Sequence, residues 1–498
     1  MAQQLDTIWH WWLLLWPHLL ATTIVAINIG FSLHALLTKR DTRSTIGWVG
    51  LIWLSPGFGA IAYAVFGVNR IRRRVTKLRA GLQAVNLRLE AAVATPSRLD
   101  EAIGPADAPL RSLATLVGEV TGQPLLDGNH VEPLGGGDEA YPRMLEAIET
   151  AERSIGLASY IFDNDPTGRL FIDALHRAVR RGVEVRVLVD GIGSRYSFPT
   201  SIGVLRRRGV PVSRFMPTTV PLYLPYANLR NHRKILVIDG RLGFTGGLNI
   251  RHGCWLAKHP PHPVKDMHFA VTGPVVTQML EVFLEDWSFA SGETLGTPSA
   301  TDSSHPWRPD LTPAGNSLAR GVRYGPDDKE VGRIKLVLIA ALASARRSVR
   351  IMTPYFLPDD AICQALGVAA LRGVNVDIVL PAQNNLALVG WASDALLWQV
   401  LSRGCRVWMS PPPFDHTKLM VVDSAWSLFG SGNWDERSMR LNFEFNTESY
   451  DRQLAEKLHH HIGTVIDRST QRTLAEVDSR SLAVRIRDGI ARLFAPYL

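Results

Sequence analysis

At 498 residues and 46% hydrophobic content, the chain can bury more than one core, which excludes an intrinsically disordered protein. The formal net charge of +8 favours an anionic partner, either nucleic acid, a membrane surface or a phosphorylated substrate. The three cysteines (Cys254, Cys363 and Cys405) are far apart and match no CxxC spacing, which argues against a disulfide framework or a zinc site.

The first predicted element is a membrane hairpin over residues 7–68. The run from Thr7 to Thr38 contains no charged residue and is long enough to span a bilayer. A second uncharged run, from Ser44 to Asn69, is interrupted by Ser-Pro-Gly-Phe-Gly at residues 55–59, so it either crosses with a kink or re-enters. A cleaved signal peptide fits poorly, because no basic residue precedes the first run and basic residues follow it.

The charges that flank these runs predict the orientation. Lys39, Arg40 and Arg43 separate the runs, and a heavier cluster follows the second: Arg70, Arg72, Arg73, Arg74, Lys77 and Arg79. The positive-inside rule predicts a multi-pass protein whose N-terminus and catalytic part are cytoplasmic. If the second run re-enters, both clusters face the same anionic leaflet.

The remainder of the chain predicts a duplicated α/β architecture. A helical connector over residues 69–126, with breaks near Pro96 and Pro105, leads into a helix–strand–helix–strand order that occurs twice. Its two occurrences cover residues 144–190 and 335–380. We expect two α/β domains at 127–290 and 321–498, joined by a Ser/Pro-rich linker at 291–320. Residues 482–494 predict an amphipathic basic helix that either packs on its own domain or binds a membrane surface.

The most specific signal is a stretch that occurs twice with the spacing H-x-K, four residues, D, six residues, G-(G or S)-x-N. The first copy comprises His232, Lys234, Asp239, Gly246, Gly247 and Asn249, and the second comprises His416, Lys418, Asp423, Gly430, Ser431 and Asn433. Residues two apart on a strand share a face, so each histidine points the same way as its lysine. Each aspartate falls at an odd offset beside Gly240 or Ser424, which favours a role in the turn or in an ion pair over chemistry.

Two such motifs around a common centre suit a phosphodiester. The lysines and asparagines hold the anionic oxygens, one neutral histidine attacks phosphorus, and the other, protonated, donates to the leaving alkoxide. Two histidines with different pKa values are required. A metal site is disfavoured because the interleaved lysines repel a cation, and no cofactor is expected.

These motifs resemble the duplicated HKD signature of the phospholipase D superfamily and, within it, the bacterial cardiolipin synthases with two N-terminal membrane segments. Further matching stretches are Tyr160-Ile-Phe162, Asn228-Leu-Arg-Asn-His-Arg-Lys234, the segment 265–274 around Asp266, Thr353-Pro-Tyr-Phe-Leu-Pro358 and Asn442-Phe-Glu444.

The resemblance implies two tandem phospholipase-D-like domains with a pseudo-twofold site at the bacterial inner membrane. It places all six His, Lys and Asp residues of the signature in the catalytic set. It assigns substrate binding to Asn249, Ser431, Asn433 and Gly247, with Gly247 lacking the hydroxyl of the commoner serine. It implies that Asp266 orients His232 and that Glu444 orients His416. The family tendency makes His232 the nucleophile.

Three functional classes compete. A phosphatidyltransferase joins two phosphatidylglycerols into cardiolipin and glycerol, without ATP, or uses another alcohol acceptor. A hydrolase acts as a phospholipase D or as a nuclease, although nucleic acid needs no bilayer anchor. A membrane scaffold with a decayed site is disfavoured by the intact motifs. We therefore predict phospholipid substrates, a membrane context and no nucleic acid, and leave the oligomeric state open.

Overall fold

A computed structural model describes residues 2–39, 41–67, 92–216, 229–296, 304–326, 330 and 332–497. The chain forms two compact units, Met1–Arg74 and Val75–Leu498. The basic cluster predicted at 70–79 and the first part of the predicted connector lie outside the described residues.

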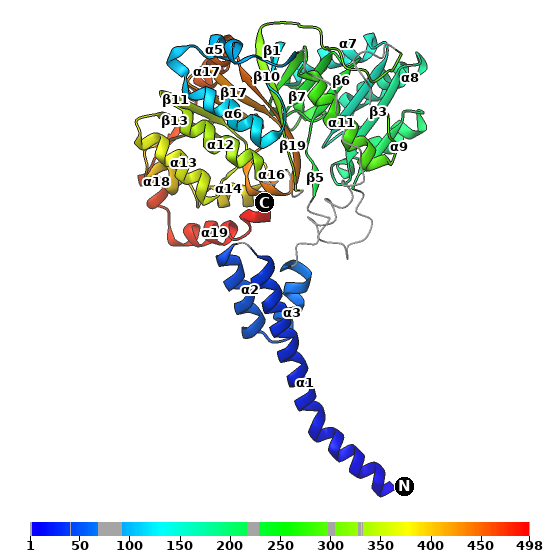
Figure 1. The fold of residues 1–498 in the computed structure, drawn as a ribbon, viewed down its shortest axis with the longest axis vertical. Coiled ribbons are helices and arrows are strands. Elements are labelled where there is room, and N and C mark those ends of the chain that lie inside the picture. The colour runs from blue at the N-terminus through cyan, green and yellow to red at the C-terminus, as the bar shows by residue number, and fades with distance from the viewer. Residues whose placement is uncertain are drawn as a thin grey trace. The chain divides into compact units, whose positions relative to one another are not determined.

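The N-terminal unit begins with one long helix, α1 (Ala2–Thr38), shown in blue in Figure 1. Its stretch Trp9–Thr38 is long and apolar enough to cross a membrane, and most of its large apolar side chains are exposed. Within the described residues no second helix meets the length and hydropathy that a crossing requires.

The second uncharged run turns back on itself. It forms α2 (Thr42–Leu54), α3 (Phe58–Ala62) and a π-helical turn, η1 (Tyr63–Gly67). Gly57 has a φ of 81°, and a Cβ on Gly59 would lie 2.2 Å from the Leu51 carbonyl oxygen, so only glycine lets α3 approach α2 this closely. Buried Tyr63 ties the turn to α1, because its hydroxyl lies 2.8 Å from His34 Nδ1.

In the second unit, the described residues form a 16-stranded sheet in the order β20-β14-β13-β11-β16-β17-β19-β10-β1-β9-β7-β6-β2-β3-β4, with β5 paired to β19. The first half contributes β1 (Leu126–Gly135), β2 (Ser154–Ser159), β3 (Glu184–Asp190), β4 (Val212–Phe215), β5 (Arg230–Asn231), β6 (Ile235–Ile238), β7 (Leu242–Gly246), β8 (Val264–Lys265) and β9 (Met267–Thr272). The second half contributes β10 (Ser317–Tyr324), β11 (Ser348–Met352), β12 (Phe356–Leu357), β13 (Asn375–Pro381), β14 (Arg406–Ser410), β15 (Phe414–Asp415), β16 (Leu419–Val422), β17 (Trp426–Gly430), β18 (Trp434–Asp435), β19 (Asn442–Tyr450) and β20 (Thr470–Arg472). Four of these strands lie outside the large sheet, where β8 pairs with β15 and β12 pairs with β18.

The strand order is a palindrome about the antiparallel pair β1–β10. Each strand on one side of this pair has a counterpart on the other side. Moving outward, the first side has the order β9, β7, β6, β2, β3 and β4, and the second side has the order β19, β17, β16, β11, β13 and β14. The parallel pairs also correspond, since β2–β3 and β3–β4 match β11–β13 and β13–β14. The expected tandem, duplicated α/β architecture is therefore confirmed.

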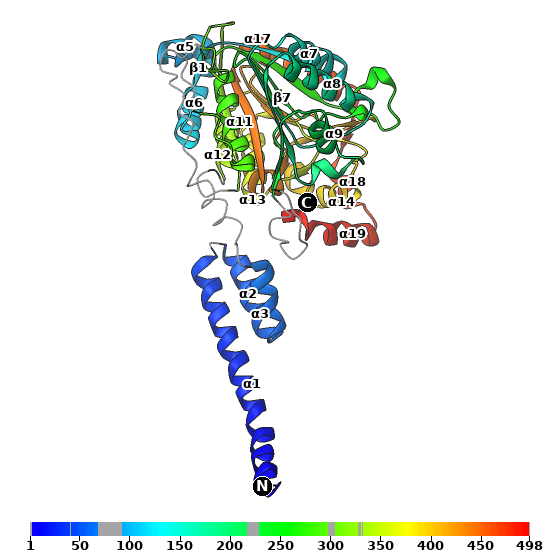
Figure 2. The same cartoon turned by 90° about the vertical axis from the view of Figure 1, so that its right-hand side faces the viewer.

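Helices cover the sheet on both sides. The first half has α7 (Gly136–Thr150), α8 (Pro166–Arg180), α9 (Ser201–Arg207), α11 (Val276–Ser291) and the short turns η4 (Gly193–Arg195), η6 (His252–Cys254) and η7 (Leu256–Lys258). The second half has α12 (Arg333–Ser344), α13 (Asp360–Leu371), α14 (Ala387–Asp394), α15 (Trp398–Leu401), α16 (Glu436–Arg440), α17 (Arg452–Ile466), α18 (Leu474–Asp478), α19 (Leu482–Arg492) and η8 (Ala495–Tyr497). Figure 2 shows α11 on one side of β7, with α7, α8 and α9 on the other.

The apolar core follows this duplication. One cluster lies under α7 and α8, with Phe171 and Leu175 among its buried residues, and a second lies under α12 and α13. The described part of the connector forms α5 (Pro96–Ile103), η3 (Pro105–Asp107) and α6 (Pro109–Thr121), which add Leu113 and Val117 to the second cluster. Its prolines occupy the first turns of these helices and begin them, where a missing N–H costs nothing.

The predicted linker 291–320 is more structured than expected. β10 begins inside it, and Trp307 is only 2% exposed because its ring stacks on Phe283 at 5.9 Å. Its low apolar content concealed this single anchoring side chain. Residues 297–303 lie outside the described residues, and the division of the chain into separate domains stays a prediction.

Candidate active site

Two very short strands position the two histidines. β5, just before His232, pairs in parallel with β19 of the second half, and the backbone N–H of His232 donates to Phe443 O at 2.9 Å. β15, just before His416, pairs in parallel with β8 of the first half, and the N–H of His416 donates to Lys265 O at 2.8 Å. Each half therefore places its histidine against a strand of the other half.

The carboxylate partners are crossed between the halves. His232 Nδ1 lies 3.0 Å from Glu444 Oε2, and His416 Nδ1 lies 2.9 Å from Asp266 Oδ2. The expected assignment, Asp266 with His232 and Glu444 with His416, is wrong in its pairing. The physical reason is the strand exchange, because Glu444 is on β19 and Asp266 directly follows β8.

The two imidazole rings meet edge to face at the centre of the site. Their centroids are 6.5 Å apart at an interplanar angle of 79°. Each ring has a tyrosine beside it, Tyr160 at 4.9 Å from His232 and Tyr355 at 6.3 Å from His416. His232 is buried and the His416 side chain is 12% exposed, and in each ring a carboxylate occupies Nδ1, which leaves Nε2 for chemistry.

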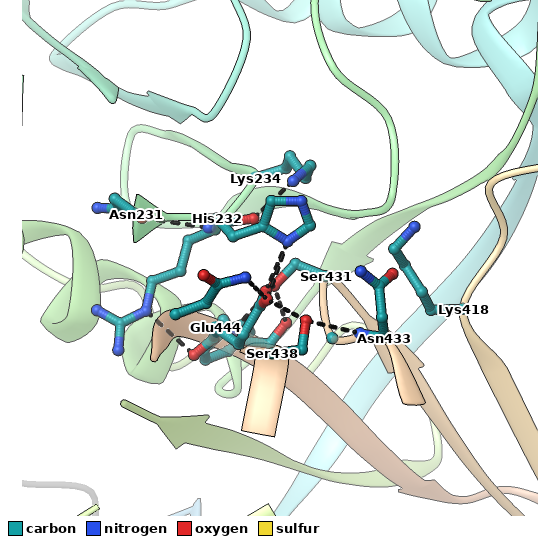
Figure 3. Close-up of polar contacts among 12 residues, drawn as sticks. Asn231, His232, Lys234, Lys418, Ser431, Asn433, Ser438 and Glu444 are labelled. Carbon is teal, nitrogen blue, oxygen red and sulfur yellow. Dashed lines mark hydrogen bonds and ion pairs between the residues drawn. The ribbon is translucent and has the colours of Figure 1, made fainter. Parts of the chain in front are cut away.

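The two lysines lie beside their own histidines. Lys234 Nζ donates to His232 O at 2.6 Å and lies 5.4 Å from the Tyr160 ring centroid, and Lys418 Nζ donates to His416 O. Figure 3 shows Lys234 and Lys418 on different sides of the His232 ring. Burial lowers the pKa of Lys234 to about 7 and that of Lys418 to about 8, although Glu444 and Asp266 oppose the shifts. Two buried cations of this kind suit an anionic ligand.

The two histidine–carboxylate pairs, which we call dyads, are chemically unequal. Besides His232, Glu444 accepts hydrogen bonds from Ser431 Oγ at 2.5 Å, Ser438 Oγ at 2.8 Å and Asn442 Nδ2 at 3.1 Å (Figure 3). Burial alone would raise the pKa of Glu444, but His232, Lys234 and Ser431 together lower it. This carboxylate is therefore held ionised.

Asp266 has fewer donors. Besides His416, its carboxylate accepts the backbone N–H of Met267 at 2.8 Å. Burial raises the pKa of Asp266 to about 8, with Lys418 opposing the shift. Burial also lowers the pKa of His232 to about 4 and that of His416 well below its ordinary value. Burial thus favours the protonated form of Asp266, whereas the donors around Glu444 favour its ionised form.

The motif aspartates lie in turns, away from this centre. The Asp239 carboxylate accepts backbone N–H groups of Glu152, Arg153 and Ser154 at 2.7–3.1 Å. Asp423 accepts the same three bonds in the second half, at 2.7–2.8 Å. Both have a φ of 53°. Their expected role in the turn is confirmed, and their place in the catalytic set stays a prediction.

The predicted substrate-binding residues divide into two kinds. The Ser431 hydroxyl donates to Glu444, so its proton serves the carboxylate and not a ligand. Gly247 has no room for a serine, because a Cβ there would lie 2.3 Å from Asp266 Oδ1. Asn249 Oδ1 accepts the N–H of Ile161 at 3.1 Å, and the buried Asn433 Oδ1 has no hydrogen-bond partner. The two asparagines are the motif residues with amide groups that can still meet a ligand.

Several supporting residues were missed by sequence reasoning. Arg233 is fully buried between the motif histidine and lysine, donates twice to Asp286 at 2.7 Å, and donates to Glu444 O at 3.1 Å. Ser438 and Asn442 hold Glu444, and only their closeness to it in the sequence pointed to them. Tyr160 and Tyr355 follow the corresponding strands β2 and β11, so the internal repeat could have assigned a role to both.

No metal site accompanies these residues in the described part of the chain, where no three His, Cys, Asp or Glu side chains gather as ligands would. The centre therefore offers two imidazoles, two buried ammonium groups and amide donors. This combination can bind a phosphodiester, attack it with nitrogen and protonate its leaving group.

Comparison with protein families identifies matches over most of the chain. Residues 144–287 and 338–466 match the family described as "Cardiolipin synthase, PLD-like domain". Residues 26–67 match "Phospholipase_D-nuclease N-terminal". The two stretches of the first family contain every histidine, lysine and carboxylate of the site.

Individual proteins match over nearly the full length. The chain is 33% identical to a cardiolipin synthase of Geobacillus kaustophilus (strain HTA426), over 96% of this chain and 93% of the relative. It is 32% identical to cardiolipin synthase A of Pseudomonas putida (strain GB-1), over 95% of this chain and 96% of the relative. Among solved structures, phosphatidylserine synthase of Haemophilus influenzae Rd KW20 is similar with a TM-score of 0.58 and 14% identity, over 78% of this chain and all of that chain, a likeness of fold alone.

Proposed function

The chain belongs to the cardiolipin synthases of the phospholipase D superfamily, and we propose that its one site transfers a phosphatidyl group between two phosphatidylglycerols. The products are cardiolipin and glycerol. The observation that carries this proposal is the pair of facing imidazoles, 6.5 Å apart, each bonded to a carboxylate of the opposite half and accompanied by a buried lysine. One phosphodiester replaces another, so the reaction needs no ATP.

In the first step His232 is the nucleophile. Ionised Glu444 accepts a hydrogen bond from the Nδ1–H group of His232. The proton therefore stays on Nδ1, and the lone pair on Nε2 is free to attack phosphorus. The N–P bond forms as the bond from phosphorus to the glycerol oxygen breaks. His416 gives its Nε2 proton to that oxygen and draws the proton retained on Asp266 to Nδ1.

In the second step a second phosphatidylglycerol supplies the acceptor hydroxyl. The neutral Nε2 of His416 removes its proton, the oxygen attacks phosphorus, and the N–P bond to His232 breaks. His416 then carries a proton on Nε2 again, and the Nδ1 proton returns to Asp266. Throughout, Lys234 and Lys418 neutralise the phosphate oxygens, and the Asn249 and Asn433 amides orient them.

The direct test supplies the purified full chain with labelled phosphatidylglycerol in liposomes and identifies the products. Cardiolipin and free glycerol are expected in equal amounts. Phosphatidic acid without cardiolipin would overturn the transferase in favour of a hydrolase. A parallel incubation with phosphatidylethanolamine added tests whether another alcohol can be the acceptor.

The nucleophile is tested separately by trapping. His416→Ala is expected to accumulate a phosphatidyl-enzyme, because the leaving glycerol can take a proton slowly from solvent while the second step lacks its base. His232→Ala is expected to trap nothing. Label found on His232→Ala and absent from His416→Ala would reverse the two roles.

For the membrane unit we propose that α1 crosses the inner membrane once and that the second run re-enters. At 1.5 Å per residue α2 spans about 20 Å, short of the bilayer core of about 30 Å. The turn at Gly57 returns the chain against α2. Both basic clusters then face the cytoplasm with the catalytic unit, and the N-terminus lies outside.

Cysteine labelling from outside intact spheroplasts tests this topology. The native cysteines are all buried, so a single introduced cysteine reports its own side. Ala2→Cys is expected to react with a membrane-impermeant maleimide, and exposed His460→Cys only after lysis. If neither cysteine reacts with the maleimide before lysis, the N-terminus is cytoplasmic and the hairpin crosses the membrane twice.

A further inference from the structure

The C-terminal helix α19 packs with an unexpected face. It lies along α14, as Figures 1 and 2 both show. Its contact side carries buried Asp488 and Ala491, with Arg487 placed 4.5 Å above the Trp391 ring. Asp488 accepts from Arg480 at 2.6 Å and from Arg487 at 2.9 Å, bonds that lie within the C-terminal segment. The helix meets the catalytic unit through Arg487 above Trp391 and through Ala491, which belongs to a small apolar cluster.

The apolar side chains of the helix point the other way. At about 3.6 residues per turn, they fall roughly opposite Asp488 and Ala491. They form one exposed stripe, which we call the outer stripe: Leu482 (72% exposed), Ile486 (53%), Ile490 (55%), Leu493 (72%) and Phe494 (51%). Packing on the catalytic unit therefore does not explain the apolar half of this amphipathic helix.

Cations border the outer stripe. Arg485 and Arg492 are exposed on one flank, and neither makes an ion pair among the contacts of the described residues. An exposed apolar stripe with arginines at its edge matches the boundary between acyl chains and anionic headgroups.

The stripe is structurally connected to the active site. Beneath α19, Ala491 belongs to a small apolar cluster with Leu357 and Val389, against which Tyr355 packs. Tyr355 in turn lies 6.3 Å from the His416 ring, and its hydroxyl donates to Asn385 at 2.8 Å. Asn385 precedes the exposed Leu386 and Leu388 at the start of α14. A surface that holds α19 thus also holds one wall of the site.

We propose that α19 is an interfacial helix whose outer stripe inserts into the anionic phospholipid leaflet and holds the mouth of the active site against the lipid surface. Phosphatidylglycerol then reaches the histidines from the leaflet without leaving it. This attachment is additional to the N-terminal anchor and does not depend on the reaction that the site performs.

The first test measures insertion without turnover. The full chain carrying Ile486→Cys is labelled with a small fluorophore and placed in phosphatidylglycerol nanodiscs. Lipids brominated on their acyl chains are expected to quench the label strongly. Leu170→Cys on α8, 46% exposed, is the matched control and is expected to show little quenching. Equal, weak quenching at both positions would overturn the proposal.

A second copy of the chain is the competing occupant. Energy transfer between labels at residue 486 on two chains in one nanodisc, rising with protein density while bromolipid quenching stays low, would identify that interface and overturn lipid insertion.

The second test separates docking from folding. The triple variant Leu482→Ser, Ile486→Ser, Ile490→Ser is expected to lose about tenfold or more of its turnover on bilayer substrate, since each apolar side chain forfeits burial in lipid. Its turnover on a short-chain, monomerically dissolved phosphatidylglycerol is expected to match that of the parent chain. Equal losses on both substrates would assign the stripe a structural role and overturn the proposal. The quenching test does not depend on the proposed function, because it reports insertion of α19 whether or not the product is cardiolipin.

Discussion

At the scale of single residues, the two dyads differ in one hydroxyl donor, which Ser431 supplies to Glu444 and Gly247 cannot supply to Asp266. Asp266 is one methylene shorter than Glu444, and it reaches His416 by approaching the backbone where a Cβ on residue 247 would stand, 2.3 Å from Oδ1. The missing hydroxyl is therefore a consequence of the shorter carboxylate. Glu444, on a longer side chain, leaves space for Ser431 and uses its proton.

Gly247→Ala should accordingly displace the Asp266 carboxylate from His416. We expect turnover to fall roughly a hundredfold, because general acid catalysis of this kind contributes about 10²–10⁴-fold. The rate on phosphatidylglycerol measures the loss, and a thermal melt checks folding. Gly203→Ala, where a Cβ meets nothing nearer than 3.4 Å, should be neutral. Normal activity in Gly247→Ala would mean that Asp266 does not orient His416.

The buried titrating groups also predict the pH profile. The proposed mechanism requires a neutral His232, and with its pKa at about 4 this histidine stays neutral at pH 5–6, where an ordinary histidine is already charged. Lys234 and Lys418 act charged, and because their pKa values are lowered to about 7 and 8, their charges are lost as pH rises through this window. A bound phosphodiester raises these pKa values again.

We therefore expect kcat/KM, which reports the free enzyme, to fall above about pH 7–8, with the fall in kcat at higher pH. Lys234→Arg is the matched variant, because Lys234 has the lower of the two pKa values and a guanidinium keeps its charge. Its alkaline limb in kcat/KM should lie higher than that of the parent chain. Coincident limbs for kcat and kcat/KM would count against buried lysines as the titrating groups.

At the scale of elements, each motif aspartate joins the turn after its motif strand to the segment that leads into β2 or β11. Three backbone N–H groups depend on each carboxylate, at matched positions in the two halves. Asp423→Asn keeps the size of the side chain and tolerates the φ of 53°, so hydrogen bonding is the main change.

Asp423→Asn is expected to destabilise the protein by about 1–3 kcal/mol, since buried N–H groups lose part of their acceptor. Turnover per folded molecule should hardly change. A thermal unfolding series in detergent measures the first quantity, and active-site-normalised rates measure the second. A large loss of kcat with unchanged stability would return Asp423 to the chemistry.

The sequence predicted the long elements better than the short ones. β2 is an apolar run and β11 alternates apolar with polar residues, and their repeat in the helix–strand order indicated the α/β class. The motif histidines were identified by the duplicated H-x-K spacing. The strands β5 and β15 are two residues long, too short for any periodicity, so their pairing with the opposite half was invisible. That pairing decides which carboxylate meets which histidine, and the predicted orienting pairs were wrong for this reason.

Burial was the other property that sequence could not supply. Asp435, two residues after Asn433 of the second motif, is buried at the start of α16, where its carboxylate accepts Ser438 N–H at 2.6 Å and burial raises its pKa to about 7. The amphipathic pattern of α19 was recognised, but hydropathy alone assigned no direction to its apolar face. The packing of Asp488 and Ala491 determines that direction.

At the scale of the whole molecule, one continuous sheet holds both halves of the site in a single chain. A mixture of His232→Ala and His416→Ala chains should therefore show no more activity than the sum of the two variants. Co-reconstitution in the same liposomes, at increasing protein density, measures this. Recovery of a substantial fraction of parental activity would mean that chains exchange halves to build a mixed site.

The β1–β10 junction also has an evolutionary consequence. Two identical chains that met around a twofold axis would carry the same side chains on both sides, so any substitution at one histidine's partner would appear at the other. Covalent fusion of the duplicated halves removes this constraint, because each copy can then mutate alone. The contrast of Gly247 and Asp266 with Ser431 and Glu444 is a specialisation that a single gene for a symmetric homodimer cannot encode, and in the proposed mechanism it separates the histidine that attacks from the one that carries the proton.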